Sequence, residues 1–206
     1  MDDLKNRRPL KTRGAGWANA LARAIGKTPL TPNGISVIGI LFAAVGAACF
    51  LFADRSQWLL LGAALGIQLR LLMNMLDGLV AVEGGKQSAT GPLYNELPDR
   101  IEDALLLVAA GYAAGVPELG YGVTVLAFGT AYIRMTGGAL GFAQDFVGPM
   151  AKQHRMFLLT VAAIVAAFLP DQNVLLYALW LLAIGNALTC AIRTWRIAQL
   201  LRAAKP

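Results

Sequence analysis

Six long apolar stretches, separated by short polar segments, run from residue 34 almost to the end of the chain. A helix needs roughly 20 apolar residues to cross the hydrocarbon core of a bilayer, and the stretches are close to that length. The separators contain residues that end helices, such as Gly84-Gly85 and Gly148-Pro149. The pattern therefore predicts an all-α membrane protein with six transmembrane helices, at residues 34–53, 57–82, 91–115, 119–145, 153–169 and 173–195.

A further helix is expected before the first apolar stretch, at residues 13–28. Trp17, Leu21 and Ile25 recur there at helical spacing, while basic residues fall on other faces. Apolar residues on one face and basic residues elsewhere are typical of a helix that lies in the membrane interface. We therefore expect an amphipathic interfacial helix, preceded by a basic tail at residues 1–12.

Two prolines within residues 28–34 separate this helix from the first span. Proline cannot continue a helix but is favoured at its first position, so we expect Thr31 to cap the next helix and Pro32 to begin it. The chain then divides into a cytoplasmic tail with its interfacial helix, residues 1–33, and a six-helix transmembrane domain, residues 34–206.

The amino-acid composition also indicates a protein that is surrounded by lipid. The chain is 57% hydrophobic and 15% charged, which is too apolar for an ordinary soluble domain. Cys49 and Cys190 both lie in apolar runs and do not suggest a disulfide framework. The net charge of +6 could indicate nucleic-acid binding, but no basic patch interleaved with aromatic residues supports it, so we expect no nucleic acid.

The distribution of Lys and Arg predicts the orientation in the membrane. Most of them precede the first span, follow the last, or lie in loops on that same side, whereas the opposite loops contain only Arg55. Cytoplasmic segments carry the Lys and Arg excess in membrane proteins. We therefore expect a multi-pass protein of the cell inner membrane with both termini cytoplasmic.

Polar side chains gather around the loop between the second and third spans, where six of the twelve acidic residues lie. Asn74 and Asp77 share one helix face, and Asn95, Asp99 and Asp103 form a stripe along the next helix. Charged groups inside a membrane bundle usually face a cavity or a partner. These oxygen ligands suit Mg²⁺ or Mn²⁺, whereas zinc is not expected with a single histidine. The first, fifth and sixth spans carry few polar groups and are expected to be scaffold.

This segment resembles the motif of the CDP-alcohol phosphatidyltransferases, D-x₂-D-G-x₂-A-R-x₈-G-x₃-D-x₃-D. The resemblance extends to the interfacial helix, to the Thr31-Pro32-Asn33 start of the first span and to the six-helix plan, so it covers most of the chain. The corresponding stretch keeps every spacing and reads Asn74-x₂-Asp77-Gly78-x₂-Ala81-Val82-x₈-Gly91-x₃-Asn95-x₃-Asp99.

Three motif positions differ from the family. Asn74 and Asn95 replace aspartates, and Val82 replaces the arginine, a role that Lys86 could take over. The family's four carboxylates suit two divalent cations, whereas two carboxylates remain here. Because like charges repel strongly at low dielectric, we expect one resident cation, or a second that arrives with the substrate diphosphate. The chain is most similar to a divergent bacterial branch of the family that also has both asparagines.

The resemblance implies a phosphotransferase of phospholipid biosynthesis. Such an enzyme moves a phosphatidyl or similar group from a CDP-linked lipid, such as CDP-diacylglycerol, to an alcohol acceptor and releases CMP. Asp99 would be the general base for the acceptor hydroxyl and also a metal ligand. Asp77 would be the firmest ligand, Asn74 and Asn95 neutral ones, and Asp103 an additional one.

Further residues of the motif would bind the nucleotide. Gly78, Ala81 and Gly91 lack bulk and would let the cytidine and its phosphates approach the helices, with Asn33 contributing at the start of the first span. Family members form homodimers, so the resemblance also implies a homodimer, with the active site at the cytoplasmic face.

A second basic group, Lys152 and Arg155, follows Gly148-Pro149, and Arg134 lies in the preceding span. In relatives that use phosphorylated acceptors, basic residues near this position bind the acceptor phosphate, and arginine suits that task through paired hydrogen bonds. The resemblance therefore predicts an acceptor that carries a phosphate.

Several alternatives remain at this stage. The motif aspartates could belong to a structural ion-pair network with Arg70 and Arg100, and Asp103 could simply pair with Arg100. The basic residues after the fourth span could reflect membrane topology alone. The chain could also be a catalytically impaired family member that binds a lipid or a nucleotide. A small transporter is less expected, because no inverted half-repeat is evident.

Overall fold

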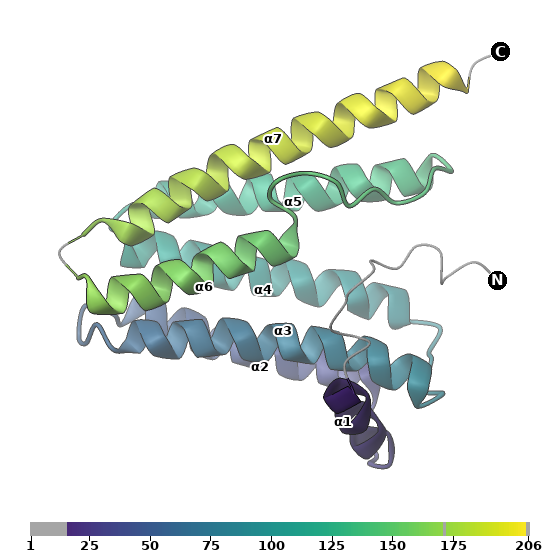
Figure 1. Ribbon diagram of the computed structural model, residues 1–206, viewed down its shortest axis with the longest axis horizontal. Coiled ribbons are helices and arrows are strands. Elements are labelled where there is room, and N and C mark those ends of the chain that lie inside the picture. Colours follow the sequence, from purple (N-terminus) through teal and green to yellow (C-terminus); the bar gives the residue numbers. More distant parts are fainter. Residues whose placement is uncertain (1–15, 171, 205–206) are drawn as a thin grey trace.

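The structure is a computed structural model that describes residues 16–170 and 172–204 (Figure 1). These residues form helices and loops without any strand, so the predicted all-α class is confirmed. The helices are α1 (Gly16–Gly26), α2 (Pro32–Leu51), α3 (Leu59–Glu83), α4 (Gly91–Ala113), α5 (Pro117–Ala139), α6 (Lys152–Phe168) and α7 (Val174–Ala203). Three of them, α2, α3 and α7, are long and apolar enough to cross a membrane. The predicted basic tail at residues 1–12 lies outside the described residues.

The helix ends follow from local sequence. The hydroxyl of Thr31 accepts a hydrogen bond from the backbone N–H of Gly34 at 3.1 Å, and Pro32 begins α2, so the predicted cap is confirmed. Gly85 and Gly115 follow the ends of α3 and α4 with φ of 61° and 70°. Only glycine adopts such angles readily, which is why the chain reverses direction at these two loops.

The predicted span at 119–145 differs from the structure, because α5 ends at Ala139. Gly141, with φ of 88°, turns the chain, and the connection runs back alongside α5 so that α6 begins near the middle of the bundle (Figure 1). Gly148 lies directly against Thr189 of α7, where an added Cβ would be 2.5 Å from the Thr189 methyl carbon. The connection therefore delivers Lys152, the first residue of α6, to the interior of the bundle.

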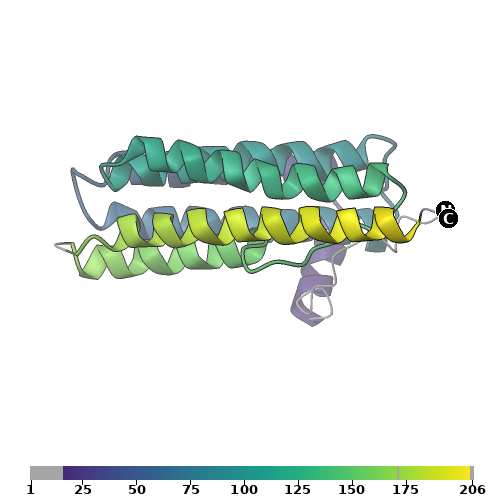
Figure 2. The same cartoon turned by 90° about the horizontal axis from the view of Figure 1, so that it is seen from above.

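The last helix is longer than predicted. It was expected to end at residue 195 but continues to Ala203, because no glycine or proline interrupts residues 196–203. At about 1.5 Å per residue, its 30 residues exceed what a bilayer core requires. Its last turns project beyond the bundle, as Figures 1 and 2 show.

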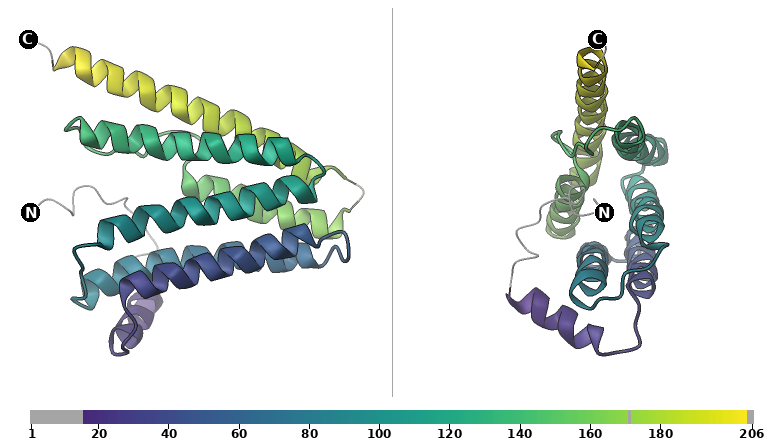
Figure 3. Two further views of the ribbon diagram at one scale, coloured as in Figure 1. Left: turned by 180° about the vertical axis from the view of Figure 1, so that it is seen from behind. Right: turned by 90° about the vertical axis from the view of Figure 1, so that its right-hand side faces the viewer.

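The six long helices lie along one common direction, with successive helices antiparallel (Figures 1 and 2). Helix α2 packs against α3 and α4, α4 also contacts α5, and α3 contacts α6. Helices α5 and α6 both pack against α7. The short helix α1 contacts α3 and lies across one end of the bundle (Figure 3). The α3–α4 loop lies at that same end, so the predicted polar segment and α1 are neighbours.

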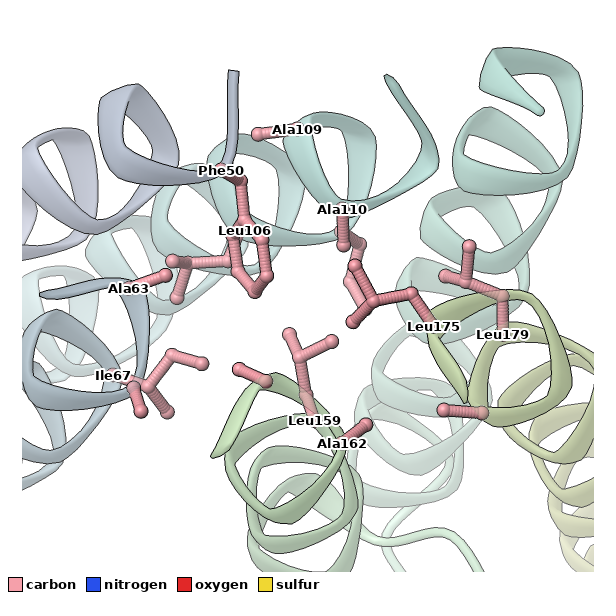
Figure 4. Packing of buried hydrophobic residues seen from close by; sticks show 14 of the residues in the cluster. Phe50, Ala63, Ile67, Leu106, Ala109, Ala110, Leu159, Ala162, Leu175 and Leu179 are labelled. Atoms are coloured by element: carbon pink, nitrogen blue, oxygen red, sulfur yellow. The ribbon is translucent and has the colours of Figure 1, made fainter. Parts of the chain in front are cut away.

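An apolar core fills the part of the bundle away from this end. Phe50, Ile67, Leu106, Leu159 and Leu179 meet there from five different helices (Figure 4). Close helix contacts in a lipid environment need small residues, and the bundle provides them. A Cβ added at Gly66 would lie 2.7 Å from the Cα of Gly46. The apolar half therefore works as a rigid frame that positions the polar end.

Candidate active site

Residues from α1 to α7 line one cavity of about 1590 Å³ at the polar end of the bundle. The structure places almost all of the predicted site residues in its wall. The predicted residues that line this cavity are Asn33, Asn74, Asp77, Gly78, Ala81, Gly91, Asn95, Asp99, Arg134, Lys152 and Arg155. The two helix faces that the spacing identified therefore converge on one space.

Asp77 is buried and held at the wall of the cavity. Its carboxylate accepts a hydrogen bond from the Ser36 hydroxyl at 2.6 Å and one from the backbone N–H of Gly78 at 2.5 Å. Ser36 was missed by sequence reasoning, because the first span was expected to be scaffold. Its signal was its place one turn after Asn33 in an otherwise apolar run. Helix α2 therefore helps to orient a motif aspartate.

Asp99 is more accessible, with 14% of its side chain exposed. Its Oδ1 accepts a hydrogen bond from the ammonium group of Lys152, and its Oδ2 lies 3.6 Å from Arg100 Nη2. The same ammonium group donates to Oδ1 of Asn74. Arg70 Nη1 is 4.0 Å from Asp99. The two asparagine positions differ, because Asn95 is exposed at the rim whereas Asn74 is half-buried.

Asp103 occupies a different environment, outside the cavity lining. Its Oδ1 accepts from Arg70 Nη2 at 2.6 Å, and its Oδ2 accepts from Arg155 Nη2 at 2.5 Å. Glu102 is also fully buried and bonds Arg70 at 2.7 Å. Arg100, the alternative partner considered for Asp103, instead lies near Glu96 and Asp99. The arginines of α3 and α6 therefore use both oxygens of Asp103.

Three arginines face the cavity from the side of α5, α6 and α7. Arg134 donates to both carboxylate oxygens of Glu96, at 2.7 and 2.6 Å, and to Gln144. Arg155 bonds Asp103 and, at 3.0 Å, the side-chain oxygen of Asn186. The last helix was expected to be scaffold, but its Arg193 lines this wall and its buried Asn186 holds Arg155.

Arg193 was missed because it was assigned to the basic tail after the last span. It is buried in α7, and its guanidinium donates to the backbone carbonyl oxygens of Val147 at 2.8 Å and Thr130 at 2.6 Å. A signal was present, since Asn186, Thr189 and Arg193 follow each other at intervals of three and four residues on one helix face.

Lys86 lines the cavity from the α3–α4 loop. Its ammonium group donates to the backbone carbonyl oxygens of Thr28 at 2.6 Å and Leu30 at 3.2 Å. Asn33 donates to the Thr90 hydroxyl at 3.1 Å on the same rim. These contacts fasten the loop to the segment before α2, so the mouth of the cavity is tied to the end of α1.

The donor atoms fit one hard cation. The ammonium group of Lys152 already lies between oxygen atoms of Asn74 and Asp99, which shows that this set of ligands accommodates a positive charge. Nowhere in residues 16–170 and 172–204 do three His, Cys, Asp or Glu side chains group to hold a metal ion. A divalent cation here would therefore rest on Asp77 and Asp99, amide oxygens and ligand oxygens, which are the atoms that Mg²⁺ and Mn²⁺ prefer.

The helical bundle and the motif cavity resemble those of the CDP-alcohol phosphatidyltransferases, and the curated relatives of this chain are enzymes of that family. No family model matches it, so the assignment rests on individual relatives. The chain is 28% identical over 191 residues to the phosphatidylinositol phosphate synthase of Mycobacterium marinum, covering 87% of this chain and 78% of the relative. It is 26% identical over 185 residues to the phosphatidylinositol phosphate synthase of Mycobacteroides abscessus, covering 85% and 80%.

Solved structures share the fold. The phosphatidylinositol phosphate synthase of Mycobacterium tuberculosis with CDP-DAG bound gives a TM-score of 0.75 at 23% identity, covering 89% of this chain and 94% of that one. The same enzyme in complex with manganese and citrate gives 0.75 at 24% identity, covering 87% and 88%. The resemblance to the CDP-alcohol phosphatidyltransferases that the motif spacing predicted is therefore supported by the two curated relatives, and the solved structures show the shared fold.

Proposed function

We propose that this chain is a membrane transferase that moves a phosphatidyl or similar group from a CDP-linked lipid to an alcohol, releasing CMP. The proposal is based on one observation: four motif residues line a single cavity that arginines of α5, α6 and α7 also line. The motif residues are Asn74, Asp77, Asn95 and Asp99. The curated relatives are phosphatidylinositol phosphate synthases, and one fold neighbour was solved with CDP-DAG. A donor such as CDP-diacylglycerol is therefore the substrate we expect.

The donor diphosphate would lie at the motif helices. Asp77 and Asp99, with the amide oxygens of Asn74 and Asn95, would hold a Mg²⁺ or Mn²⁺ ion there. A bound divalent cation would supply positive charge for the transferring phosphoryl group and the leaving CMP. Gly78, Ala81 and Gly91 line the same wall without bulk and leave room for the nucleotide, and Asn33 lies at the rim.

Asp99 is the general base in this proposal. Its carboxylate is partly exposed to the cavity, whereas Asp77 is more deeply buried and bound by Ser36 and Gly78. A base must reach the hydroxyl proton that it removes, and Asp99 is the motif carboxylate with that access. It would take the proton of the acceptor hydroxyl as the new bond to phosphorus forms.

The acceptor carries a phosphate group in this proposal. Arg134, Arg155 and Lys152 line the cavity beside the motif, and Arg193 joins them from α7. Of these four residues, Arg193 gives the strongest support for a phosphate-bearing acceptor. It is buried, and its hydrogen bonds within the described residues go to carbonyl oxygens. A buried cation that forms no close ion pair within the described residues is costly in a membrane bundle, and an anionic ligand would stabilise it.

The membrane arrangement follows the same reasoning. We propose that α2 to α7 are six transmembrane helices forming one domain, that both termini are cytoplasmic and that the cavity opens to the cytoplasmic face of the inner membrane. The amphipathic helix α1 would lie on the lipid surface, because Trp17 and Leu21 are exposed on it while Ala22 packs against the bundle. We also propose a homodimer, as in the family. A carboxy-terminal green fluorescent protein fusion should fluoresce, and the particle mass in nanodiscs should correspond to two chains.

The direct test of the activity is transfer of radiolabel from CDP-diacylglycerol to an alcohol by the purified protein in Mg²⁺ or Mn²⁺. Wild-type protein should release CMP and form a new lipid, and Asp99→Asn should not. A phosphorylated alcohol should react faster than its neutral counterpart, and equal rates would contradict a phosphate-bearing acceptor.

A second candidate function is lipid or nucleotide binding without catalysis. It is favoured by the two missing carboxylates and by the contact between Lys152 and the proposed base Asp99. Saturable binding of CDP-diacylglycerol with no CMP release, for any acceptor or metal, would support it against the transferase.

A further inference from the structure

We propose that the ammonium group of Lys152 is a built-in cation of this site and takes the place of one of two divalent cations, so that the chain binds a single metal ion. The inference rests on the proposed function, because it concerns the same cavity. It assigns Lys152 to the motif helices rather than to the acceptor phosphate.

The position of Lys152 is the first support. It is the first residue of α6, which begins inside the bundle after the connection folds back from α5. Its ammonium group crosses to α3 and α4 and donates to Oδ1 of Asn74 and Oδ1 of Asp99, two of the motif positions. A cation from the protein itself thus already bridges the two motif helices.

The orientation of Asn74 is the second support. Its side-chain oxygen accepts from Lys152, and its Nδ2 lies 3.3 Å from Glu102, where it donates. An ammonium group can only donate and a carboxylate can only accept, so these two neighbours fix the amide orientation. An aspartate at position 74 would face the carboxylate of Glu102 at low dielectric and be repelled. Asparagine is therefore the residue that this pair of neighbours requires.

Glu102 is held in place by its neighbours and positions the side chain of Asn74. It is fully buried, and Arg70 Nη1 bonds it at 2.7 Å. A Cβ added at Gly39 of α2 would lie 2.6 Å from Glu102 Oε1, so the carboxylate fills the space beside that glycine. The replacement of the first motif aspartate by asparagine is thus matched by Glu102 on one side and by Lys152 on the other.

The charge balance agrees with one divalent cation. Asp77 and Asp99 together with Lys152 carry a formal charge of −1. One divalent ion brings this to +1 and two would bring it to +3, so in the absence of substrate a second ion would have to enter a site that is already positive. Asp77 bonds Ser36 and Gly78 rather than Lys152, so it remains the acidic ligand for the single metal ion.

The test measures Mn²⁺ binding to the full chain in nanodiscs, by calorimetry and by electron paramagnetic resonance, without any donor lipid. Wild-type protein should bind one ion per chain. Lys152→Met should bind Mn²⁺ at least about tenfold more tightly, because a positive charge next to the ion has been removed. Lys152→Arg keeps the charge and should stay close to wild type.

Lys86→Met is the matched control. It removes the same charge from the same cavity, but its ammonium group bonds backbone carbonyl oxygens rather than the motif, so the Mn²⁺ affinity should change by less than about threefold. Adding Asn74→Asp to Lys152→Met should create a second, measurable Mn²⁺ site. Thermal unfolding without metal identifies any variant that fails to fold.

Two results would overturn the inference: two Mn²⁺ ions per wild-type chain, or a Lys152→Met affinity equal to that of wild type. Both readouts are independent of turnover. One bound ion without any transfer activity would defeat only the proposed function, and transfer activity with two bound ions would defeat only the role of Lys152.

Discussion

Asp99 and Asp103 lie one helical turn apart on α4, about 6 Å along the helix axis, yet their surroundings differ in burial and in bonded partners. Asp103 is fully buried, and two arginines use both of its oxygens. Asp99 faces the cavity with 14% of its side chain exposed, and Lys152 contacts one of its oxygens. We infer from this comparison that a carboxylate stabilises the fold where arginines bind both of its oxygens, and that it is available for chemistry where it faces the cavity.

The largest effect should come from Asp99→Asn, which removes the proposed base and keeps one of its two side-chain oxygens. General-base catalysis contributes about 10²–10⁴-fold, so we expect transfer from CDP-diacylglycerol to fall by about three orders of magnitude. The unfolding temperature should stay near that of wild type, because Asp99 is not saturated by buried partners. If Asp99→Asn instead unfolds at a lower temperature but keeps its transfer activity, Asp99 is the structural carboxylate and not the base.

Asp103→Asn should lower the stability of the protein more than it affects the site. Breaking a buried ion pair by removing one partner costs about 3–5 kcal/mol, and here Arg70 and Arg155 would both lose a charged partner. We expect a clearly lower unfolding temperature in detergent, with little change in Mn²⁺ affinity at low temperature. Glu118→Gln, which alters an exposed acid in the first turn of α5, is the control and should be nearly neutral.

The same contrast separates two arginines. Arg155 is neutralised by Asp103, whereas Arg193 bonds only carbonyl oxygens among its hydrogen bonds in the described part of the chain. Arg193→Gln should therefore raise the KM for a phosphorylated acceptor by about tenfold, which is about 1.4 kcal/mol. The KM for a neutral alcohol should not change. Equal effects on both acceptors would assign Arg193 to structure rather than to the acceptor phosphate.

Spacing along one helix predicts which residues share a face but not how deep each lies in the bundle. The stripe of Asn95, Asp99 and Asp103 was correctly predicted to lie on one helix. In the structure, however, Asn95 is exposed at the rim of the cavity, Asp99 lines the cavity, and Asp103 is buried between two arginines. That difference depends on arginines from α3 and α6, whose reach is set by how helices pack. The helix caps and the motif spacing are local features, which is why they could be predicted.

The connection before α6 illustrates the same limit. A continuous apolar pattern predicted that α5 would run to residue 145, whereas Gly141 turns the chain and brings Lys152 inside the bundle. Ser36 was missed because it is a single polar residue in a long apolar run, and Arg193 because it was assigned to the basic tail. Their partners, Asp77 and the carbonyl oxygen of Val147, are distant in sequence.

The smallest expected effect tests whether Asp77 belongs with Asp99 or with Asp103 in this comparison. Ser36→Ala removes the hydroxyl that bonds Asp77 at 2.6 Å. A single hydrogen bond contributes about 1 kcal/mol, so the transfer rate and the Mn²⁺ affinity should each fall by about fivefold, with little loss of stability. Thr136→Ala, which removes an exposed hydroxyl bonded to its own helix at Tyr132, is the matched control. If Ser36→Ala lowers the unfolding temperature and leaves Mn²⁺ binding intact, Asp77 is a structural carboxylate like Asp103, and the single metal ion must rest on Asp99 alone.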